Sequence, residues 1–139
     1  MKRMEARRAM SRNLLGLRVL VVEDEYMIAQ MIAEILERAG CVVIGPESDL
    51  DAALHAVRHK KIDGVLLDIN LGGTLIFPLA DQLDANKVPY LFVTGYGPYT
   101  VPDRFRNHPL IAKPFMPHVL LQTLQDVAAK GDRFNPATP

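Results

Sequence analysis

The chain has 139 residues, and 49% of them are hydrophobic, which suits one compact domain and excludes a disordered chain. The formal net charge is zero, but residues 1–18 carry +5 and the remaining 121 residues carry −5, a distribution that does not favour binding to nucleic acid. The single cysteine, Cys41, excludes an intrachain disulfide and a metal cluster built on cysteines.

The first segment of the chain is basic and has few apolar residues to anchor it. We therefore predict a basic arm at residues 1–16, a domain at residues 17–131 and a short tail at residues 132–139. The apolar stretch at residues 14–22 contains Arg18 and is shorter than the roughly 18 residues that a membrane span needs. It also lacks the small-residue cleavage site of a signal peptide, so we expect a cytoplasmic protein without membrane insertion.

Short apolar runs alternate along the chain with segments of helical periodicity. The runs are rich in aliphatic residues, which is typical of buried parallel strands. The predicted strands are residues 19–22, 41–44, 65–67, 90–93 and 110–112. The predicted helices carry apolar stripes at Met27, Ile28, Met31, Ile32, Ile35 and Leu36; at Leu50, Ala53, Leu54 and Val57; at Leu75, Leu79 and Leu83; and at Val119, Leu120, Leu124, Val127 and Ala128. This alternation predicts an α/β domain, with an open parallel sheet and helices on both faces.

The segment between the fourth and fifth predicted strands breaks the pattern. Residues 95–102 contain two glycines and two prolines, which interrupt helices. Only residues 103–107 have a composition that allows about one turn of helix. The fourth helix is therefore expected to be weak or irregular.

Polar residues follow four of the predicted strands. Glu23 and Asp24 follow the first, Asp68 the third, Thr94 the fourth and Lys113 the fifth. Because ligands bind beyond the carboxyl ends of the strands in an open α/β sheet, we expect these side chains to converge. Three crowded carboxylates repel one another unless a cation lies among them, and Mg²⁺ suits such oxygen ligands. Asp68 could then attack phosphorus, with the cation, Lys113 and Thr94 stabilising the phosphoryl oxygens.

Four short motifs surround these residues. They are VVEDE at residues 21–25, LDINL at 67–71, VTG at 93–95 and AKPF at 112–115. Together, and in this order, they resemble the receiver domain of response regulators in two-component signalling, over roughly residues 17–130. The resemblance implies a flavodoxin-like, doubly wound sheet of five parallel strands in the order 2-1-3-4-5.

The same resemblance implies a role for each site residue. Asp68 corresponds to the phosphoacceptor, Thr94 to the switch hydroxyl that binds a phosphoryl oxygen, and Lys113 to the lysine that pairs with the phosphate. The implied Mg²⁺ ligands are Glu23, Asp24, Asp68 and the backbone carbonyl of Asn70. A cis peptide bond between Lys113 and Pro114 is also implied.

A closer resemblance is to the FAT GUY subfamily, most of whose members are stand-alone bacterial receivers. It depends on residues 71–73, 92–97 and 104–106. The chain departs from this pattern at Val93, where alanine is usual, and has Leu110 where receivers commonly have an aromatic residue. The usual switch through Thr94 and an aromatic ring is therefore altered. We hypothesise that phosphorylation orders residues 95–108 and that Tyr96 covers the phosphoryl site.

These residues predict a single-domain response regulator rather than an enzyme. A histidine kinase is the expected phosphoryl donor, a histidine phosphotransfer protein is a further candidate partner, and the chain is expected to be a monomer or a weak dimer. One alternative is a degenerate receiver that binds partners without phosphorylation, although all five motif positions are present. The other is a phosphatase of the haloacid dehalogenase type. Such a phosphatase needs a second aspartate where this chain has Asn70.

Overall fold

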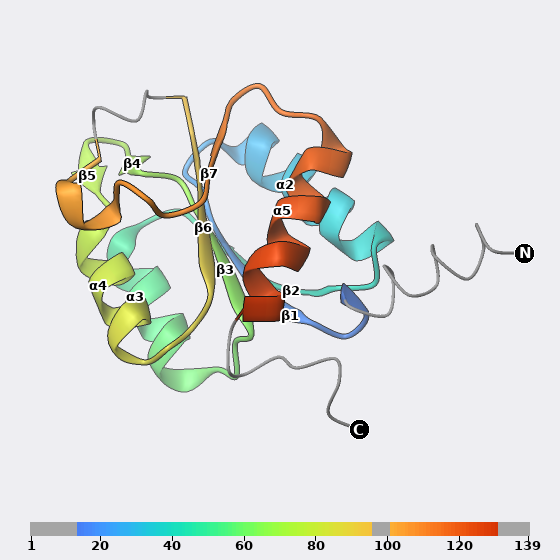
Figure 1. Cartoon of the computed structure of the whole chain (residues 1–139), viewed down its shortest axis with the longest axis horizontal. Helices are drawn as coiled ribbons and strands as arrows, with labels where there is room; N and C mark the ends of the chain where they lie inside the picture. The colour runs from blue at the N-terminus through green and yellow to red at the C-terminus, as the bar shows by residue number, and fades with distance from the viewer. Residues whose placement is uncertain (1–13, 96–100, 131–139) are drawn as a thin grey trace, which may run out of the picture.

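The computed structural model describes residues 14–95 and 101–130, and its centre is a five-stranded parallel sheet (Figure 1). The strands are β1 (Arg18–Val22), β2 (Val42–Glu47), β3 (Gly64–Leu67), β6 (Tyr90–Thr94) and β7 (Leu110–Ala112). Their order across the sheet is β2-β1-β3-β6-β7, which confirms the predicted order 2-1-3-4-5. The predictions for the basic arm before Leu14, for Tyr96 and for the tail after residue 131 lie outside the described residues.

Helices cover both faces of the sheet (Figure 1). Helices α2 (Tyr26–Arg38) and α5 (Pro117–Lys130) lie on one face, and α3 (Leu50–His59) and α4 (Phe77–Ala85) lie on the other. Alternate residues of β1 pack on opposite faces of the sheet, because successive side chains of a strand point in opposite directions. Val19 packs in the cluster that contains Leu36 of α2, whereas Leu20 packs in the cluster that contains Ala53 of α3.

Two of the predicted helical stripes differ from the structure. Met27 in α2 is 81% exposed and Met31 is also exposed, so the buried stripe of α2 is narrower than its apolar pattern. Leu75 lies outside α4, in a small antiparallel hairpin of β4 (Asn70–Leu71) and β5 (Thr74–Leu75). The leucine spacing that suggested a longer helix therefore crosses an element boundary.

A side-chain hydrogen bond closes this hairpin. The backbone N–H of Gly73 donates to Oδ1 of Asn70 at 2.6 Å. Gly72 and Gly73 have φ angles of 58° and 100°, a conformation that glycine adopts without the clash that a Cβ would cause. Asparagine followed by paired glycines is a turn signal, so the sequence contained the information for a hairpin that the helix prediction missed.

The irregular segment before β7 is anchored to α4. Its only described helical turn is a 3₁₀ helix, η2 (Asp103–Phe105), in agreement with the expected weak helix. Phe105 is 2% exposed and stacks on Phe77 at a ring-centroid distance of 5.4 Å. Arg104 binds Asp81 of α4 through two hydrogen bonds of 2.9 Å. This packing anchors residues 104 and 105 to α4. The hypothesised ordering of residues 95–108 on phosphorylation stays a prediction, and residues 96–100 of that element lie outside the described residues.

The described chain already contributes to the core at Leu14, before the expected domain start at residue 17. Leu14 is buried, and the backbone N–H of Gly16 donates to the carbonyl of Gly40 at 2.7 Å. Within the described ranges, no helix is long and apolar enough to cross a membrane.

Replacement of Phe105 by alanine should destabilise the protein strongly. The substitution leaves a cavity among Phe77, Phe92 and Arg104, and such losses cost about 3 kcal/mol or more of unfolding free energy. Urea unfolding measures the change, with Arg106→Ala as an exposed neighbouring control. A cost for Phe105→Ala as small as that for Arg106→Ala would mean that the segment is not part of the core.

Replacement of Asn70 by alanine should loosen the hairpin. The loss of one hydrogen bond to a backbone N–H costs about 1 kcal/mol. Amide hydrogen exchange at Gly73 should therefore accelerate, whereas Thr74→Ala, an exposed change in the same hairpin, should leave it unchanged. Equal exchange rates at Gly73 in the two variants would contradict the role of the Asn70 side chain.

Candidate functional site

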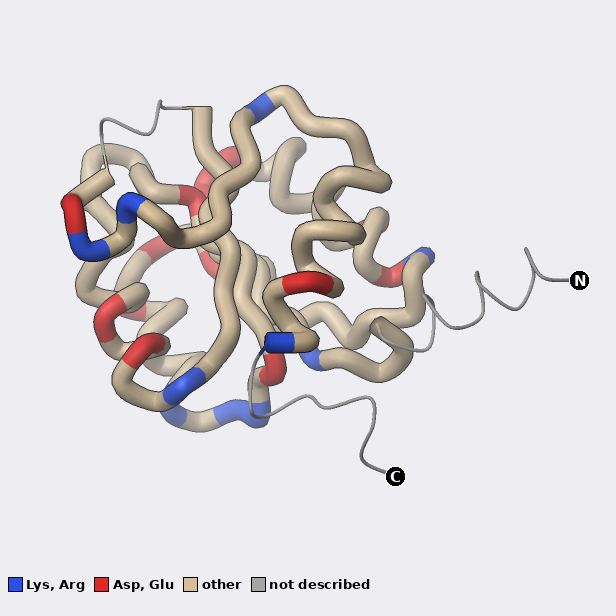
Figure 2. Tube along the Cα trace, in the orientation of Figure 1, with Lys and Arg blue, Asp and Glu red and all other residues tan. Residues whose placement is uncertain are grey.

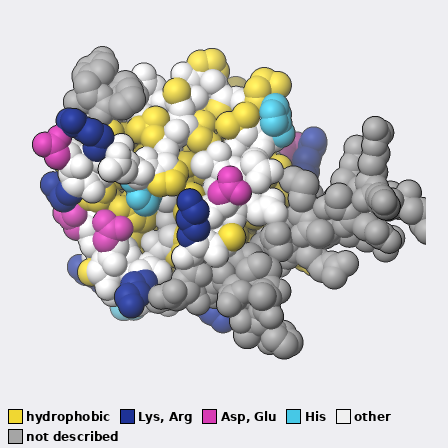
Figure 3. All heavy atoms as spheres, viewed as in Figure 1, with side chains coloured by type: hydrophobic (Ala, Val, Ile, Leu, Met, Phe, Trp, Pro, Cys, Tyr) yellow, Lys and Arg dark blue, Asp and Glu magenta, His cyan; other side chains and the backbone are white. Residues whose placement is uncertain are grey.

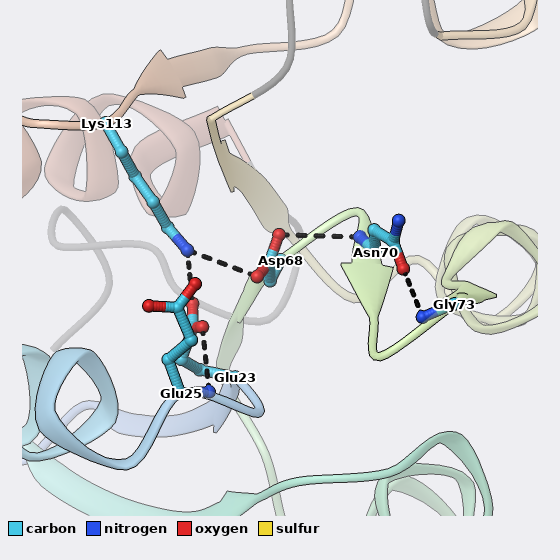
Figure 4. A network of polar contacts seen from close by, with 6 residues as sticks. All are labelled: Glu23, Glu25, Asp68, Asn70, Gly73 and Lys113. Atoms are coloured by element: carbon cyan, nitrogen blue, oxygen red, sulfur yellow. Dashed lines mark hydrogen bonds and ion pairs between the residues drawn. The ribbon is translucent and has the colours of Figure 1, made fainter.

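The predicted site residues lie at the carboxyl ends of neighbouring parallel strands. Glu23 and Asp24 follow β1, Asp68 follows β3, Thr94 ends β6 and Lys113 follows β7. Because the strands run in the same direction, these ends share one edge of the sheet. Figure 4 shows the side chains of Glu23, Asp68 and Lys113 pointing toward one another from three separate segments.

Lys113 joins two buried carboxylates. Its Nζ donates to Oε2 of Glu23 at 2.8 Å and to Oδ2 of Asp68 at 3.1 Å. Glu23 and Asp68 are both buried, and the Lys113 side chain is largely covered. Hydrogen bonds between charged groups at such a site are shorter and stronger than those between neutral groups. The contact therefore fixes the end of β7 against the ends of β1 and β3.

The buried charges alter the ionisation of the site. Burial raises the pKa of Glu23 to about 7, its hydrogen bond to Lys113 opposes the shift, and the neighbouring charge of Asp68 adds to it. Burial by itself lowers the pKa of Lys113, but its hydrogen bond to Glu23 and the charge of Asp68 outweigh that effect, so the pKa is raised. Lys113 therefore remains a cation, and one cation does not fully compensate the carboxylates around it.

The carboxylates are also close enough to share a metal ion. Glu23, Asp24 and Asp68 each offer an oxygen, and these oxygens lie within 4.8 Å of one another. Oxygen-only ligands, with one exposed residue among them, suit a hard cation that keeps several waters. The residues at this edge therefore fit Mg²⁺ by their chemistry and their spacing.

The β4–β5 hairpin borders the acidic cluster. The backbone N–H of Asn70 points at Oδ1 of Asp68 at 3.4 Å, a long hydrogen bond, and the same residue holds Gly73 through its side chain (Figure 4). A Cβ on Gly72 would lie 3.6 Å from Oδ2 of Asp24. The hairpin thus forms one wall of the site, a feature that the strand and helix patterns did not predict.

The remaining predicted residues are placed by β6 and β7. Thr94 is fully buried, and its carbonyl accepts the backbone N–H of Lys113 at 2.9 Å. Leu110 pairs with Phe92 and packs against the core as a partly buried strand residue. The peptide bond between Lys113 and Pro114 is cis, as predicted.

Comparison with known proteins identifies the family. The family model of the response regulator receiver domain matches residues 19–125. The phyllosphere-induced regulator PhyR of Methylorubrum extorquens is 35% identical over 108 residues, which cover 71% of this chain and 39% of that protein. The sensory transduction protein LytT of Bacillus anthracis is 36% identical over 114 residues, covering 78% of this chain and 46% of that protein. The chain spans less than half the length of these two relatives.

Solved structures agree with this assignment. SdrG from Sphingomonas melonis Fr1 is 35% identical with a TM-score of 0.73, covering 82% of this chain and 97% of that chain. PhyR from Brucella abortus is 29% identical with a TM-score of 0.76, covering 90% of this chain and 52% of that chain. The chemotaxis response regulator CheY4 of Vibrio cholerae is 27% identical with a TM-score of 0.71, covering 81% of this chain and 98% of that chain. With the family match, the sheet order and the acidic edge in agreement, the chain belongs to the response regulator receiver domain family.

Proposed function

We propose that this protein is a single-domain response regulator that accepts a phosphoryl group from a histidine kinase on Asp68. The observation that carries the proposal is the contact of a buried Asp68 carboxylate with Lys113, beside two further carboxylates. Receiver domains take phosphate from histidine kinases. SdrG, which is similar over nearly its whole length, favours a receiver that acts without an attached output domain.

The proposed reaction is a transfer between two side chains. An oxygen of Asp68 forms a bond to phosphorus while the bond from phosphorus to the imidazole nitrogen of the donor breaks, and that nitrogen keeps the electron pair. The product is an acyl phosphate on Asp68. Lys113 lies 3.1 Å from one oxygen of Asp68, so its ammonium can neutralise the charge that the phosphoryl group brings.

Mg²⁺ would be held by the acidic edge. Its proposed ligands are the carboxylates of Glu23, Asp24 and Asp68 and the backbone carbonyl of Asn70. When bound, the ion supplies positive charge to the phosphoryl oxygens. The protein residues orient Asp68, because the Asn70 N–H and the Lys113 ammonium each donate to a different oxygen of its carboxylate.

The response to phosphorylation would begin at Thr94. Its hydroxyl is proposed to bind a phosphoryl oxygen, and its burial at the end of β6 limits the ways in which it can move. Leu110, which occupies the usual aromatic position, packs against the core and has no polar group to relocate. In place of an aromatic ring at position 110, we propose that Tyr96, two residues after Thr94, covers the phosphoryl site.

Apolar side chains near the site suit a protein donor. Tyr26 and Met27 are exposed at the start of α2, and Met116 is exposed just before α5. These two helices lie side by side on one face of the sheet (Figure 1). Exposed apolar residues around a polar centre are typical of protein interaction sites. A kinase or a histidine phosphotransfer protein is the proposed partner at this surface.

Replacement of Asp68 by asparagine should abolish phosphorylation, because an amide cannot attack phosphorus as a carboxylate does. The protein is incubated with acetyl phosphate and Mg²⁺, and the mass of one phosphoryl group is measured on the intact chain. Lys113→Met should retain some label but lower the rate about 100-fold, through loss of one charge-stabilising group. Asp126→Asn, an exposed carboxylate change in α5, is the control.

The alternative of a phosphorylation-independent receiver makes a different prediction. Beryllofluoride with Mg²⁺ should perturb the amide resonances of Asp68, Asn70 and Thr94 in the proposed function and leave them unchanged in the alternative. Unchanged resonances, together with equal labelling of the wild type and Asp68→Asn, would refute the assignment of Asp68.

Mg²⁺ should stabilise the folded protein through the acidic edge. At about 100 times its dissociation constant, the ion should raise the free energy of unfolding by about 2.7 kcal/mol. Urea unfolding at increasing Mg²⁺ measures this gain. Asp24→Asn should weaken the response, whereas Glu25→Gln, an exposed neighbour outside the cluster, should not. An identical Mg²⁺ response in the two variants would exclude Asp24 as a ligand.

A further inference from the structure

A hollow lies at the end of the sheet opposite Asp68. Its volume is about 410 Å³, and it lies between the end of α4, the start of β6, the residues before β7 and the end of α5. Its polar and charged lining residues are Asp84, Lys87, Tyr90, Asn107, His108 and Lys130. None of these residues belongs to the acidic edge, so the hollow is separate from the proposed phosphorylation site.

Two stacked rings line the hollow. The His108 ring lies against Tyr90 with centroids 3.9 Å apart and planes inclined by 17°. Nε2 of His108 lies 2.6 Å from the carbonyl of Tyr90, so this nitrogen carries the proton and donates. The hydroxyl of Tyr90 donates to Oδ2 of Asp84 at 3.0 Å. Nε2 of His108, the Tyr90 hydroxyl and one oxygen of Asp84 are therefore engaged within the protein.

Two lysines, Lys87 and Lys130, lie at the edge of the hollow. Among the described residues, neither Lys87 nor Lys130 has a carboxylate within ion-pair distance. Figure 2 shows basic and acidic residues interspersed at this end of the molecule, near the ends of α4 and α5. Figure 3 shows basic and acidic side chains interspersed on this face, with histidine among them. Asp84 keeps its negative charge while one of its oxygens accepts from Tyr90, so the lining combines two ammonium groups with one carboxylate and carries a net positive charge.

Lys87 also adopts a strained backbone conformation. Its φ angle is 56°, and it is the only described residue other than glycine with a positive φ. It directly follows the last turn of α4, where the Val88 N–H donates to the carbonyl of Leu83 at 2.9 Å. Helices that end in this way favour glycine at the left-handed position, because a Cβ clashes there. A lysine at this position costs stability, and strain of this kind gathers at binding sites.

We propose that the hollow binds a small organic anion, with a planar or apolar body and one carboxylate-like group. Its volume lies within the range of small-molecule sites. Pro109 and the edges of Val88 and Val127 provide apolar contact. The partly buried His108 ring, stacked on the buried Tyr90, provides a flat surface, and Lys87 and Lys130 provide the complementary charge. A ligand of this kind would meet each of these groups at once.

The test uses the full chain and a matched pair of probes, 2-naphthoate and its neutral analogue 2-naphthamide. Titration of the ¹⁵N-labelled protein should give saturable shifts at Tyr90, His108 and Lys87 with naphthoate. The amide should bind about fivefold more weakly, since an exposed ion pair contributes up to about that factor in affinity.

Two lysine variants separate the site from nonspecific attraction. Lys87→Gly should weaken naphthoate binding about threefold to fivefold and at the same time raise the urea midpoint of unfolding, because glycine relieves the strain. Lys130→Gln should weaken binding by a similar factor without the gain in stability. Lys60→Gln, which removes an exposed charge outside the hollow, should change neither property.

Three results would overturn the proposal. The first is an absence of naphthoate shifts around Tyr90 and His108. The second is equal affinity for naphthoate and naphthamide, or unchanged affinity in both Lys87→Gly and Lys130→Gln. The third is naphthoate-dependent shifts confined to residues 131–139, which would mean that the probe binds the last segment of the chain rather than the hollow.

Discussion

The ammonium of Lys113 between the buried carboxylates of Glu23 and Asp68 is the contact on which the rest of the site depends. These three residues come from the ends of three strands, and each is positioned by a backbone that the sheet holds. Burial makes the contact strong, because charges interact more strongly away from water. Burial also makes it costly to break, because removal of the cation would leave two carboxylates facing each other.

The parallel sheet explains why such a contact can form at all. Strand ends that are 45 and 90 residues apart in sequence meet at one edge because β1, β3, β6 and β7 run in the same direction. The buried middle of each strand is apolar, so the polar residues fall where each strand leaves the core. The polar site residues therefore gather at the edge where these strands leave the core.

The apolar character of the strands is also why the strands, and the polar residues that follow them, could be predicted from the sequence. Aliphatic runs such as residues 19–22 and 65–67 can form little other than buried strands, and a polar residue directly after each run marks the edge. The failures have a common cause, because helical spacing says which residues share a face but not where the helix begins. Leu75 was assigned to a helix although two glycines had already turned the chain into a hairpin. Met27 has the spacing of a core residue, but its position at the start of α2 leaves it exposed. The contacts of Phe105 and the hollow around Tyr90 join distant segments, which periodicity does not address.

The acidic edge also shows how function opposes stability in this fold. Burial raises the pKa of Glu23 to about 7, so the folded protein holds this carboxylate ionised only at a cost in free energy. The hydrogen bond from Lys113 offsets part of this free-energy cost, and a divalent cation among Glu23, Asp24 and Asp68 would offset more of it. The core does not need these charges, because both apolar clusters are complete without them. A site that costs stability in the absence of an ion gains more from binding one, so the carboxylates that weaken the fold suit the Mg²⁺ binding and phosphoryl transfer that we propose for this edge.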